Sequence, residues 1–305
     1  MFEVKHIVVG SDGSPEGSDA LVLGAALASV SGATLDLVGV FSLPLLLIPN
    51  VSEGRALRRA TERALGEQRR QFAPTALVRT VADRSYARAL GRFAQRARAD
   101  IVVIGSSRHA PAGRCEIGRH SRQLLSEAPF ALAIAKRGLH RTGAELQSIG
   151  VGYEGGPESA TAAAFASALS RAASAQLRVL TVAEDSVPAF TAAEWMAVGS
   201  DWDSLRSSRL QKAREEAEEL AADLPVRSEV LAAVGDPGTQ LREWSDDVDL
   251  TVVGSRRWGA IARLVSGSVG ETLVSDAGSS VLIVPRPTAD KHRARRQPTL
   301  QGAHN

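Results

Sequence analysis

The sequence predicts an α/β protein made of two tandem doubly wound domains, each with a five-stranded parallel sheet of Rossmann-like type. Residues 8–16 run from an apolar strand into a turn that contains Gly and Pro, and residues 150–158 do the same 142 positions later. A second pair of segments, 100–108 and 249–257, ends a further apolar strand in each half. A repeat of this size indicates a duplicated domain. Strands that alternate with helices indicate right-handed βαβ units and therefore a parallel sheet.

The elements of the first half follow from local patterns. Residues 4–10 form a short apolar run closed by glycine, which indicates a strand buried on both faces. Pro15, a preferred first-turn residue, opens a helix that extends to about residue 30. The further predictions are strands at 35–41, 76–81, 101–105 and 130–135, and helices at 53–72, 86–97 and 118–126.

The second half repeats this order. Its second helix has apolar residues at helical spacing, which are Leu210, Ala213, Ala217 and Leu220. Its strands are predicted at 149–152, 177–183, 226–231, 250–254 and 281–284. We therefore place the domains at residues 1–140 and 141–288, followed by a basic tail at 289–305.

The charge distribution disfavours a nucleic-acid-binding protein. The chain has 44% hydrophobic and 23% charged residues and a formal charge of +2. Residues 286–305 hold five basic residues against one acidic residue, which leaves the rest of the chain at −2. A near-neutral body lacks the clustered basic face that nucleic acid needs. We expect the Arg-rich end to be solvated and disordered.

Cysteine usage and the apolar segments predict a cytoplasmic protein. One cysteine, Cys115, excludes an intramolecular disulfide and fits a reducing cytosol. The first ten residues are typical of a strand and not of a signal peptide. The apolar segment 41–49 has about half the length of a membrane span and contains two prolines, so we expect no membrane crossing.

Each half places a carboxylate directly after its first strand, at the edge where ligands of doubly wound sheets bind. Asp12 follows Gly10 by two positions, and Glu154 follows Gly152 in the same way. Asp12 has two interpretations, as the N-cap of the next helix or as the acceptor for an exocyclic amine or a ribose hydroxyl. Glu is a poor N-cap, so an acid in both halves gives the ligand interpretation equal standing.

The pattern Gly150-x-Gly152-x-x-Gly155 formally matches a dinucleotide-binding fingerprint. The first repeat, however, has Val8 where the first glycine of that motif would stand. No dehydrogenase-like second domain follows either. We therefore disfavour a NAD(P) site.

The loop after the fourth strand of the second half ends in a Gly-Ser pair. Gly254 follows Val253 at the end of the strand, and Gly267, Ser268 and Val269 open the next helix. Backbone amides at a helix start, with the positive end of the helix dipole, form an anion site. The Ser268 hydroxyl adds a donor. The alternative is that Gly267 and Ser268 only cap the helix.

With these loops, both halves resemble the universal stress protein family, over essentially residues 1–286. Members that bind ATP carry a Gly-x2-Gly-x9-Gly-Ser/Thr motif after strand four. The resemblance implies a stress-response regulator and not an enzyme, with ATP, alone or with Mg²⁺, as the expected ligand. The positions that match acids or adenine-facing residues are Asp12, Glu154, Val40 and Val182. The positions that match the phosphate motif are Gly105, Gly118, Gly254, Gly267 and Ser268.

The phosphate motif departs from the family pattern in both halves. Arg108 and Arg257 replace the second glycine, and Arg119 stands where the first half would have Ser or Thr. Arg108 and Arg257 either fill the phosphate path or bind phosphate themselves, whereas Arg119 removes the hydroxyl donor. If the backbone there needs a positive φ, an Arg costs about 1 kcal/mol or more. Because the first half departs twice, we predict ATP binding mainly in the second half and scarcely in the first.

No catalytic or metal-binding constellation is apparent. His109, Cys115 and His120 share one loop, but their spacing matches no zinc pattern. No Ser-His-Asp arrangement, P-loop lysine or pair of catalytic carboxylates can be assembled. The sequence therefore predicts neither enzyme activity nor a metal site.

The connections after the second strands support an alternative function. Both are apolar, with Leu43 and residues 45–48 in one and Phe190, Trp195, Met196 and Trp202 in the other. They either join the core, or they form lids or a surface for a protein partner or a second copy of the chain. In the latter case the protein is a nucleotide-free adaptor. Single domains of the family pair through their last strands, so we expect residues 130–135 to face 281–284 here.

Overall fold

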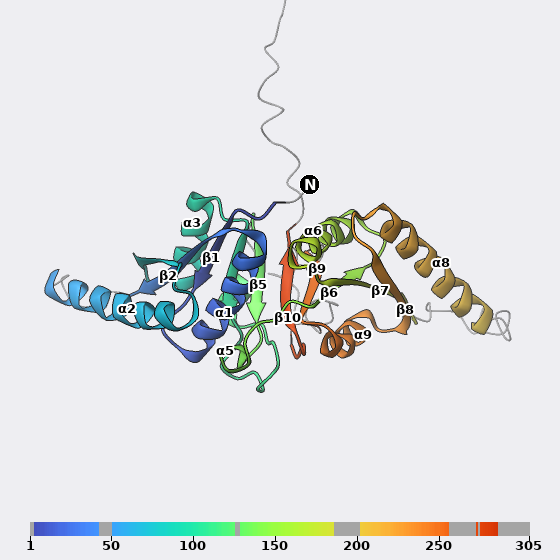
Figure 1. The fold of residues 1–305 in the computed structure, drawn as a ribbon. Helices are drawn as coiled ribbons and strands as arrows, with labels where there is room; N and C mark the ends of the chain where they lie inside the picture. The colour runs from blue at the N-terminus through green and yellow to red at the C-terminus, as the bar shows by residue number, and fades with distance from the viewer. Residues whose placement is uncertain are drawn as a thin grey trace, which may run out of the picture.

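The computed structural model describes residues 3–42, 51–125, 129–185, 202–255, 273 and 275–285. Within these ranges ten strands form one sheet, in the order β3-β2-β1-β4-β5-β10-β9-β6-β7-β8 (Figure 1). Each half contributes five neighbouring strands that pair in parallel. The strand order reverses at β1 in one half and at β6 in the other. The predicted pair of doubly wound domains is therefore confirmed.

The first half is built from β1 (His6–Gly10), α1 (Pro15–Ser31), β2 (Thr34–Phe41), α2 (Val51–Phe72), β3 (Leu77–Ala82), α3 (Tyr86–Ala97), β4 (Ile101–Gly105), α4 (Arg119–Leu125) and β5 (Ala131–Ala135). The apolar run of β4 is buried along its first four residues, as expected for a strand covered by helices on both faces. Small residues let α1 lie close to the sheet, since a Cβ on Gly24 would be 2.4 Å from Val9 Cγ2.

The second half is built from β6 (Ser148–Tyr153), α6 (Pro157–Ala173), β7 (Gln176–Glu184), α8 (Trp202–Asp223), β8 (Ser228–Gly235), α9 (Pro237–Trp244), β9 (Leu250–Gly254) and β10 (Ser280–Val284). Two short helices were not predicted, α5 (Leu139–Thr142) and the 3₁₀ helix η2 (Ser245–Asp247). Helices this short have no apolar periodicity to detect.

The largest boundary error concerns β8. We predicted residues 226–231, whereas the strand spans Ser228–Gly235 because its ladder with β7 continues to the pair Glu184 and Gly235. The domain boundary predicted between residues 140 and 141 lies within α5 and stays a prediction. The apolar residues 43–48, 190, 195 and 196 and the basic tail lie outside the described residues.

The two halves join through their last strands, as predicted. β5 pairs with β10 in antiparallel register, with Leu132 opposite Ile283 and Ala133 opposite Leu282. All residues of both strands are buried. The sheet is therefore continuous across the molecule, and its centre is the junction between the halves (Figure 1).

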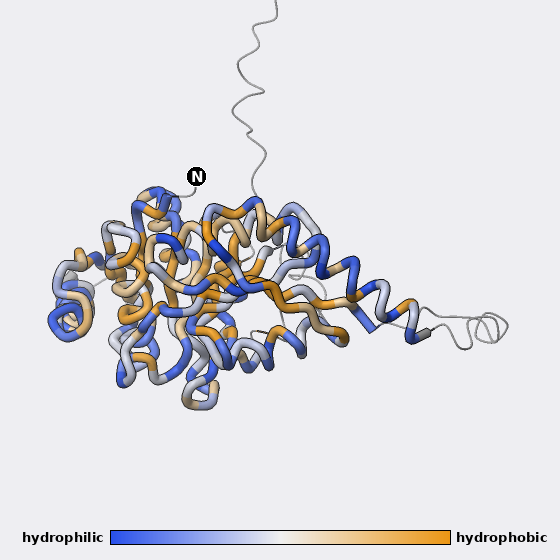
Figure 2. The backbone as a smooth tube through the Cα atoms, turned by 45° about the vertical axis from the view of Figure 1, so that its right-hand side comes forward, coloured by the Kyte–Doolittle hydropathy of each residue, from blue (hydrophilic) through white to orange (hydrophobic). Residues whose placement is uncertain are grey.

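Apolar residues concentrate along the central strands, while the outer helices are largely hydrophilic (Figure 2). The core beneath α1 and α6 is continuous across the two halves and includes Ala20, Leu139 and Ala162. α2 and α8 lie at opposite ends of the molecule (Figure 1). Among the described residues, every helix is too short or too polar to span a bilayer.

Candidate functional site

The turn between β1 and α1 holds Asp12 outside the helix cap. Ser14 is the N-cap, because its hydroxyl accepts a hydrogen bond from the Gly17 amide at 3.2 Å. Asp12 lies two residues earlier, and its Oδ1 accepts the Ser14 amide at 3.0 Å. The interpretation of Asp12 as an N-cap is therefore wrong. Its carboxylate instead lines a cavity at the strand end.

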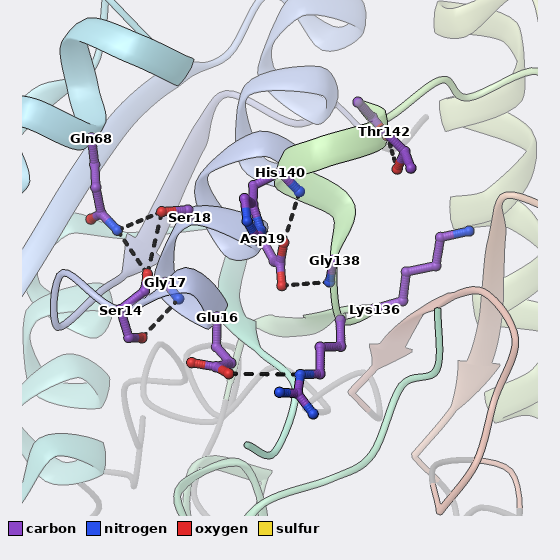
Figure 3. Close-up of polar contacts among 12 residues, drawn as sticks. Ser14, Glu16, Gly17, Ser18, Asp19, Gln68, Lys136, Gly138, His140 and Thr142 are labelled. Atoms are coloured by element: carbon purple, nitrogen blue, oxygen red, sulfur yellow. Dashed lines mark hydrogen bonds and ion pairs between the residues drawn. The ribbon is translucent and has the colours of Figure 1, made fainter. Parts of the chain in front are cut away.

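A buried glutamine from α2 holds this turn in place (Figure 3). Gln68 Nε2 donates to the Ser14 carbonyl at 2.9 Å and to the Ser18 hydroxyl at 2.8 Å. Its Oε1 accepts the Ser11 hydroxyl at 2.7 Å. Because Gln68, Ser11 and Ser18 are buried, losing one of these side chains would leave its partners unsatisfied. The position of the turn is therefore set by a helix that is remote in sequence.

Two strand-end glycines allow the first turns of α1 and α6 to approach the ends of β4 and β9. A Cβ on Gly105 would lie 2.3 Å from the carbonyl oxygen of Glu16, in the first turn of α1. Gly254 meets the carbonyl oxygen of Glu158 in α6 in the same way, at 2.7 Å. Only glycine fits such close backbone contact. Gly118, by contrast, has no positive φ, and a Cβ there would meet nothing closer than 3.9 Å.

Hydrogen bonds of Ser106 hold the end of the loop between β4 and α4 beside its beginning. The Ser106 hydroxyl accepts the Glu116 amide at 2.7 Å and donates to the Glu116 carbonyl at 3.2 Å. The Ser107 amide donates to the same carbonyl at 2.9 Å. This closure brings Gly118 beside Ser107, so the two ends of the loop form neighbouring parts of one wall.

Arg108 extends from this loop to the turn after β1. Its Nη2 donates to Asp12 Oδ2 at 2.8 Å, and the two side chains are 70% and 47% exposed. An exposed pair of this kind contributes at most about 1 kcal/mol. The described non-glycine residues with positive φ are Arg98 and Ser174, so Arg108 carries no such backbone strain.

The electrostatics keep Asp12 ionised. Burial raises the pKa of Asp12, but hydrogen bonds from Ser14 and the positive charge of Arg108 outweigh it, so the pKa lies below its ordinary value. Burial, together with the charge of Asp12, raises the pKa of Tyr86 above its ordinary value. At neutral pH the site therefore combines a carboxylate with a neutral phenol.

These loops enclose a cavity of about 520 Å³ at the carboxyl ends of β1 and β4. Its lining comprises residues 10–12, 14, 16 and 17, residues 104–109, residues 118–121, and Tyr86. Of the predicted site residues, the structure brings together Gly10, Asp12, Gly105, Arg108 and Gly118. Val40 does not line this cavity but lies on β2, paired with Val81 of β3.

The second half repeats the start of this arrangement. The Glu154 amide donates to Ser159 Oγ at 3.3 Å, while Gly156 is the N-cap of α6, so Glu154 does not cap the helix. Gly152 packs against Leu241 of α9. The acid after the first strand is therefore outside the helix cap in both halves.

The remaining predicted residues of the second half divide into two groups. Val253 is buried in the core, and Val182 packs against the same core. Residues 257 and 267–269 lie outside the described residues. The roles of Arg257, Gly267, Ser268 and Val269 in a phosphate loop therefore stay sequence predictions.

Tyr86 and Gln68 were not predicted as site residues from the sequence. Tyr86 opens α3, and a Cβ on Gly10 would lie 2.3 Å from its hydroxyl oxygen. Its ring also contacts His120, with ring centroids 5.4 Å apart. The available signal was its place just after a strand, at the ligand-binding edge of the sheet. The sequence signal for Gln68 was weaker: it is a polar residue one helical turn after the buried Leu65, and therefore lies on the face of α2 that packs against the protein.

The described residues contain no cluster of three His, Cys, Asp or Glu side chains suited to a metal ion. His109 and His120 line the cavity. Cys115 is instead buried, in a bridge to Ala277 of the second half.

The comparison with family models defines the class of protein. The model of the universal stress protein family matches residues 3–136 and again residues 145–285. The chain therefore belongs to the universal stress protein family and contains two such domains in tandem. A search of curated proteins returned no significant match.

Solved structures share the tandem fold. A universal stress protein from Archaeoglobus fulgidus DSM 4304 matches with a TM-score of 0.68 and 15% identity, covering 93% of this chain and 100% of that one. A putative universal stress protein from Pseudomonas aeruginosa UCBPP-PA14 matches with a TM-score of 0.61 and 15% identity, covering 92% and 93%. At these identities the likeness concerns the fold alone.

Proposed function

We propose that this protein is a nucleotide-responsive stress regulator that binds ATP or a related adenine nucleotide, mainly in its second half, and catalyses no reaction. The observation that carries the proposal is the repeated strand-end scaffold. In each half an acid follows the first strand outside the helix cap. A glycine at the end of the fourth strand lets the first turn of the first helix come close to the sheet. The second half combines this scaffold with the Gly267-Ser268 pair of the phosphate motif.

The first half differs in a way that supports this ranking. Both carboxylate oxygens of Asp12 already accept hydrogen bonds, from Ser14 and from Arg108. An adenine amine or a ribose hydroxyl would have to share a carboxylate oxygen with one of these donors. Because Ser14 and Arg108 already use part of the accepting capacity of Asp12, a nucleoside gains less from this carboxylate.

A ligand can regulate this protein only through a difference in affinity between two conformations. In doubly wound sheets the loops after the second and fourth strands leave the edge at which ligands bind, so we propose that they are the segments that a nucleotide would bias. We expect the stress signal to pass through these loops to a protein partner.

ATP titration of the full chain by calorimetry, with and without Mg²⁺, tests the proposal. We expect Glu154→Gln to weaken ATP binding by about tenfold, since a hydrogen bond to a charged group is worth roughly 1.5–3 kcal/mol. Ser268→Ala should weaken it less, because it removes one neutral donor. Glu145→Gln is the matched control, as it removes an exposed carboxylate elsewhere in the chain.

Mass spectrometry of the denatured protein adds an independent readout, because a nucleotide retained through purification would be released. If no adenine nucleotide is released and ATP does not bind, the proposal fails. That result would favour the alternative, an adaptor that acts without nucleotide through its apolar connections.

A further inference from the structure

Several hydroxyl groups of the first-half cavity and the carboxylate of Asp12 already make hydrogen bonds within the protein. Asp12 accepts hydrogen bonds at both oxygens. The Ser11 hydroxyl donates to Gln68, and the Ser14 hydroxyl accepts the Gly17 amide. The Ser106 hydroxyl both donates to and accepts from Glu116. Few of these groups remain to recognise the hydroxyls and amines of a nucleoside.

The arginines of the cavity, in contrast, have hydrogen-bond donors that no described residue uses. Arg119 lines the cavity and has no ion-pair partner within the described part of the chain. Arg108 uses one nitrogen for Asp12, and a guanidinium has five N–H donors. The other acid of the lining, Glu16, lies 3.9 Å from Arg137 and is thereby already compensated. The groups of this cavity that remain available to a ligand are therefore mainly positively charged.

Both arginines line the same cavity. Ser106 closes the loop onto Glu116, and Gly118 lies beside Ser107. Arg108 and Arg119 directly follow these two neighbouring residues. Two guanidinium groups in one cavity match a ligand with adjacent phosphates, each of which can be bound through two N–H groups.

The opposite side offers no described slot for a base. Tyr86 forms the wall beside Gly10, and its ring lies against His120. Val40, the position at which the resemblance placed adenine, is not part of the lining, and neither is any other described residue of β2. Among the described residues, the groups best placed to hold a ligand in this cavity are therefore the cationic side chains.

We propose that the first-half cavity binds phosphate-rich anions through Arg108 and Arg119 and does not recognise a nucleobase. The ligand class is an oligophosphate or a compound that carries one. Such a ligand competes with Asp12 for Arg108, so Asp12 opposes binding. An acid that recognised adenine or ribose would instead favour it. This second site differs from the adenine site proposed for the second half in both place and chemistry.

Calorimetric titration of the full chain with tripolyphosphate tests this site, with GTP, ATP and adenosine compared in parallel. We expect tripolyphosphate to bind one site per chain and GTP to compete for it, whereas adenosine does not compete. Arg119→Gln should weaken tripolyphosphate by about tenfold. Arg96→Gln, which removes an exposed arginine of α3 outside the cavity, should leave it nearly unchanged.

The sign of the effect of Asp12→Asn provides the sharpest distinction. We expect this variant to bind tripolyphosphate several-fold more tightly, because Arg108 is released and a negative charge is removed. Weaker binding, or competition by adenosine, would overturn the proposal. So would absence of tripolyphosphate binding, or equal losses in Arg119→Gln and Arg96→Gln.

The same titrations separate this proposal from the function proposed for the second half. If both hold, Arg119→Gln loses tripolyphosphate affinity but keeps an adenosine-competed ATP site that depends on Glu154. If only the anion site exists, ATP binding falls together with tripolyphosphate binding in Arg119→Gln. If only the adenine site exists, tripolyphosphate binding does not depend on Arg119.

Discussion

At the residue scale, the two motif glycines of the first half have different roles although they belong to one motif. Gly105 lies where the backbone of α1 meets the end of β4, and a side chain there would collide with a carbonyl group. A Cβ on Gly118 would make only ordinary van der Waals contact with Ser107, at 3.9 Å, and the residue has no positive φ. The motif therefore contains one glycine required by packing and one that packing does not require.

Alanine substitutions should separate these roles. We expect Gly105→Ala to lower the free energy of unfolding by about 1–3 kcal/mol, because the new methyl group forces β4 and α1 apart. Gly118→Ala should be neutral or stabilising by up to about 1 kcal/mol, since it reduces the entropy of the unfolded chain. Urea unfolding measures both. Equal losses in the two variants would contradict this assignment.

At the element scale, the short helix α5 is held to the first half by a buried acid (Figure 3). Asp19 of α1 is 1% exposed and accepts the Gly138 amide at 2.9 Å and the His140 amide at 2.7 Å. It also lies 2.6 Å from the Nδ1 of His140. The segment that leads from β5 into the second half is therefore positioned by polar contacts to one side chain.

We expect Asp19→Asn to destabilise the protein by about 1–3 kcal/mol, because the amide nitrogen cannot accept a hydrogen bond and leaves a buried donor unpaired. Asp223→Asn is the control, as it removes an exposed carboxylate at the C-terminal end of α8, where negative charge is not favoured. Thermal and urea unfolding of both variants would show the difference. If Asp223→Asn loses as much stability as Asp19→Asn, the effect arises from the change in net charge and not from the buried hydrogen bonds.

At the scale of the whole molecule, the loop that lines the first-half cavity also contacts the second half. Arg114 Nη1 lies 2.8 Å from Asp246 Oδ1, and its Nε lies 3.8 Å from Asp276 Oδ1. Cys115 pairs with Ala277 through two backbone hydrogen bonds of 2.7 and 3.1 Å. A ligand in the cavity therefore contacts the same loop that joins the two halves.

Thiol labelling of Cys115 reports on this junction. We expect slow labelling of the native protein near neutral pH, because burial raises the pKa of the Cys115 thiol to about 12 and the thiolate is the reactive form. Arg114→Ala should accelerate labelling several-fold by removing the contacts to Asp246 and Asp276. Arg108→Ala, in the same loop but paired within the first half, should not.

Global stability is measured alongside, so that an increase in labelling caused by general unfolding can be subtracted. Equal labelling rates in the two arginine variants would show that the contacts of Arg114 do not hold the junction closed.

The sequence predicted most of the fold because the buried strands have unusually clear patterns. Strands such as residues 101–105 and 250–254 are continuous apolar runs. Because the domain is duplicated, each strand assignment is supported by two copies of the sequence pattern. The polar contacts of the site could not be predicted in the same way. Gln68 contacts a turn more than fifty positions away, and no local pattern encodes such a partner.

By itself, therefore, the sequence determined the two-fold repeat, the doubly wound order of elements and the glycines at the strand ends. These follow from short-range periodicity and from comparison of the two copies, whereas the pairing of the last strands was expected from the family resemblance. Only the tertiary structure decided that Asp12 accepts a hydrogen bond from Arg108 instead of capping α1, and that Tyr86 lines the first-half cavity. Those features depend on side chains from separate elements meeting in space, and such meetings are set by packing and not by local sequence.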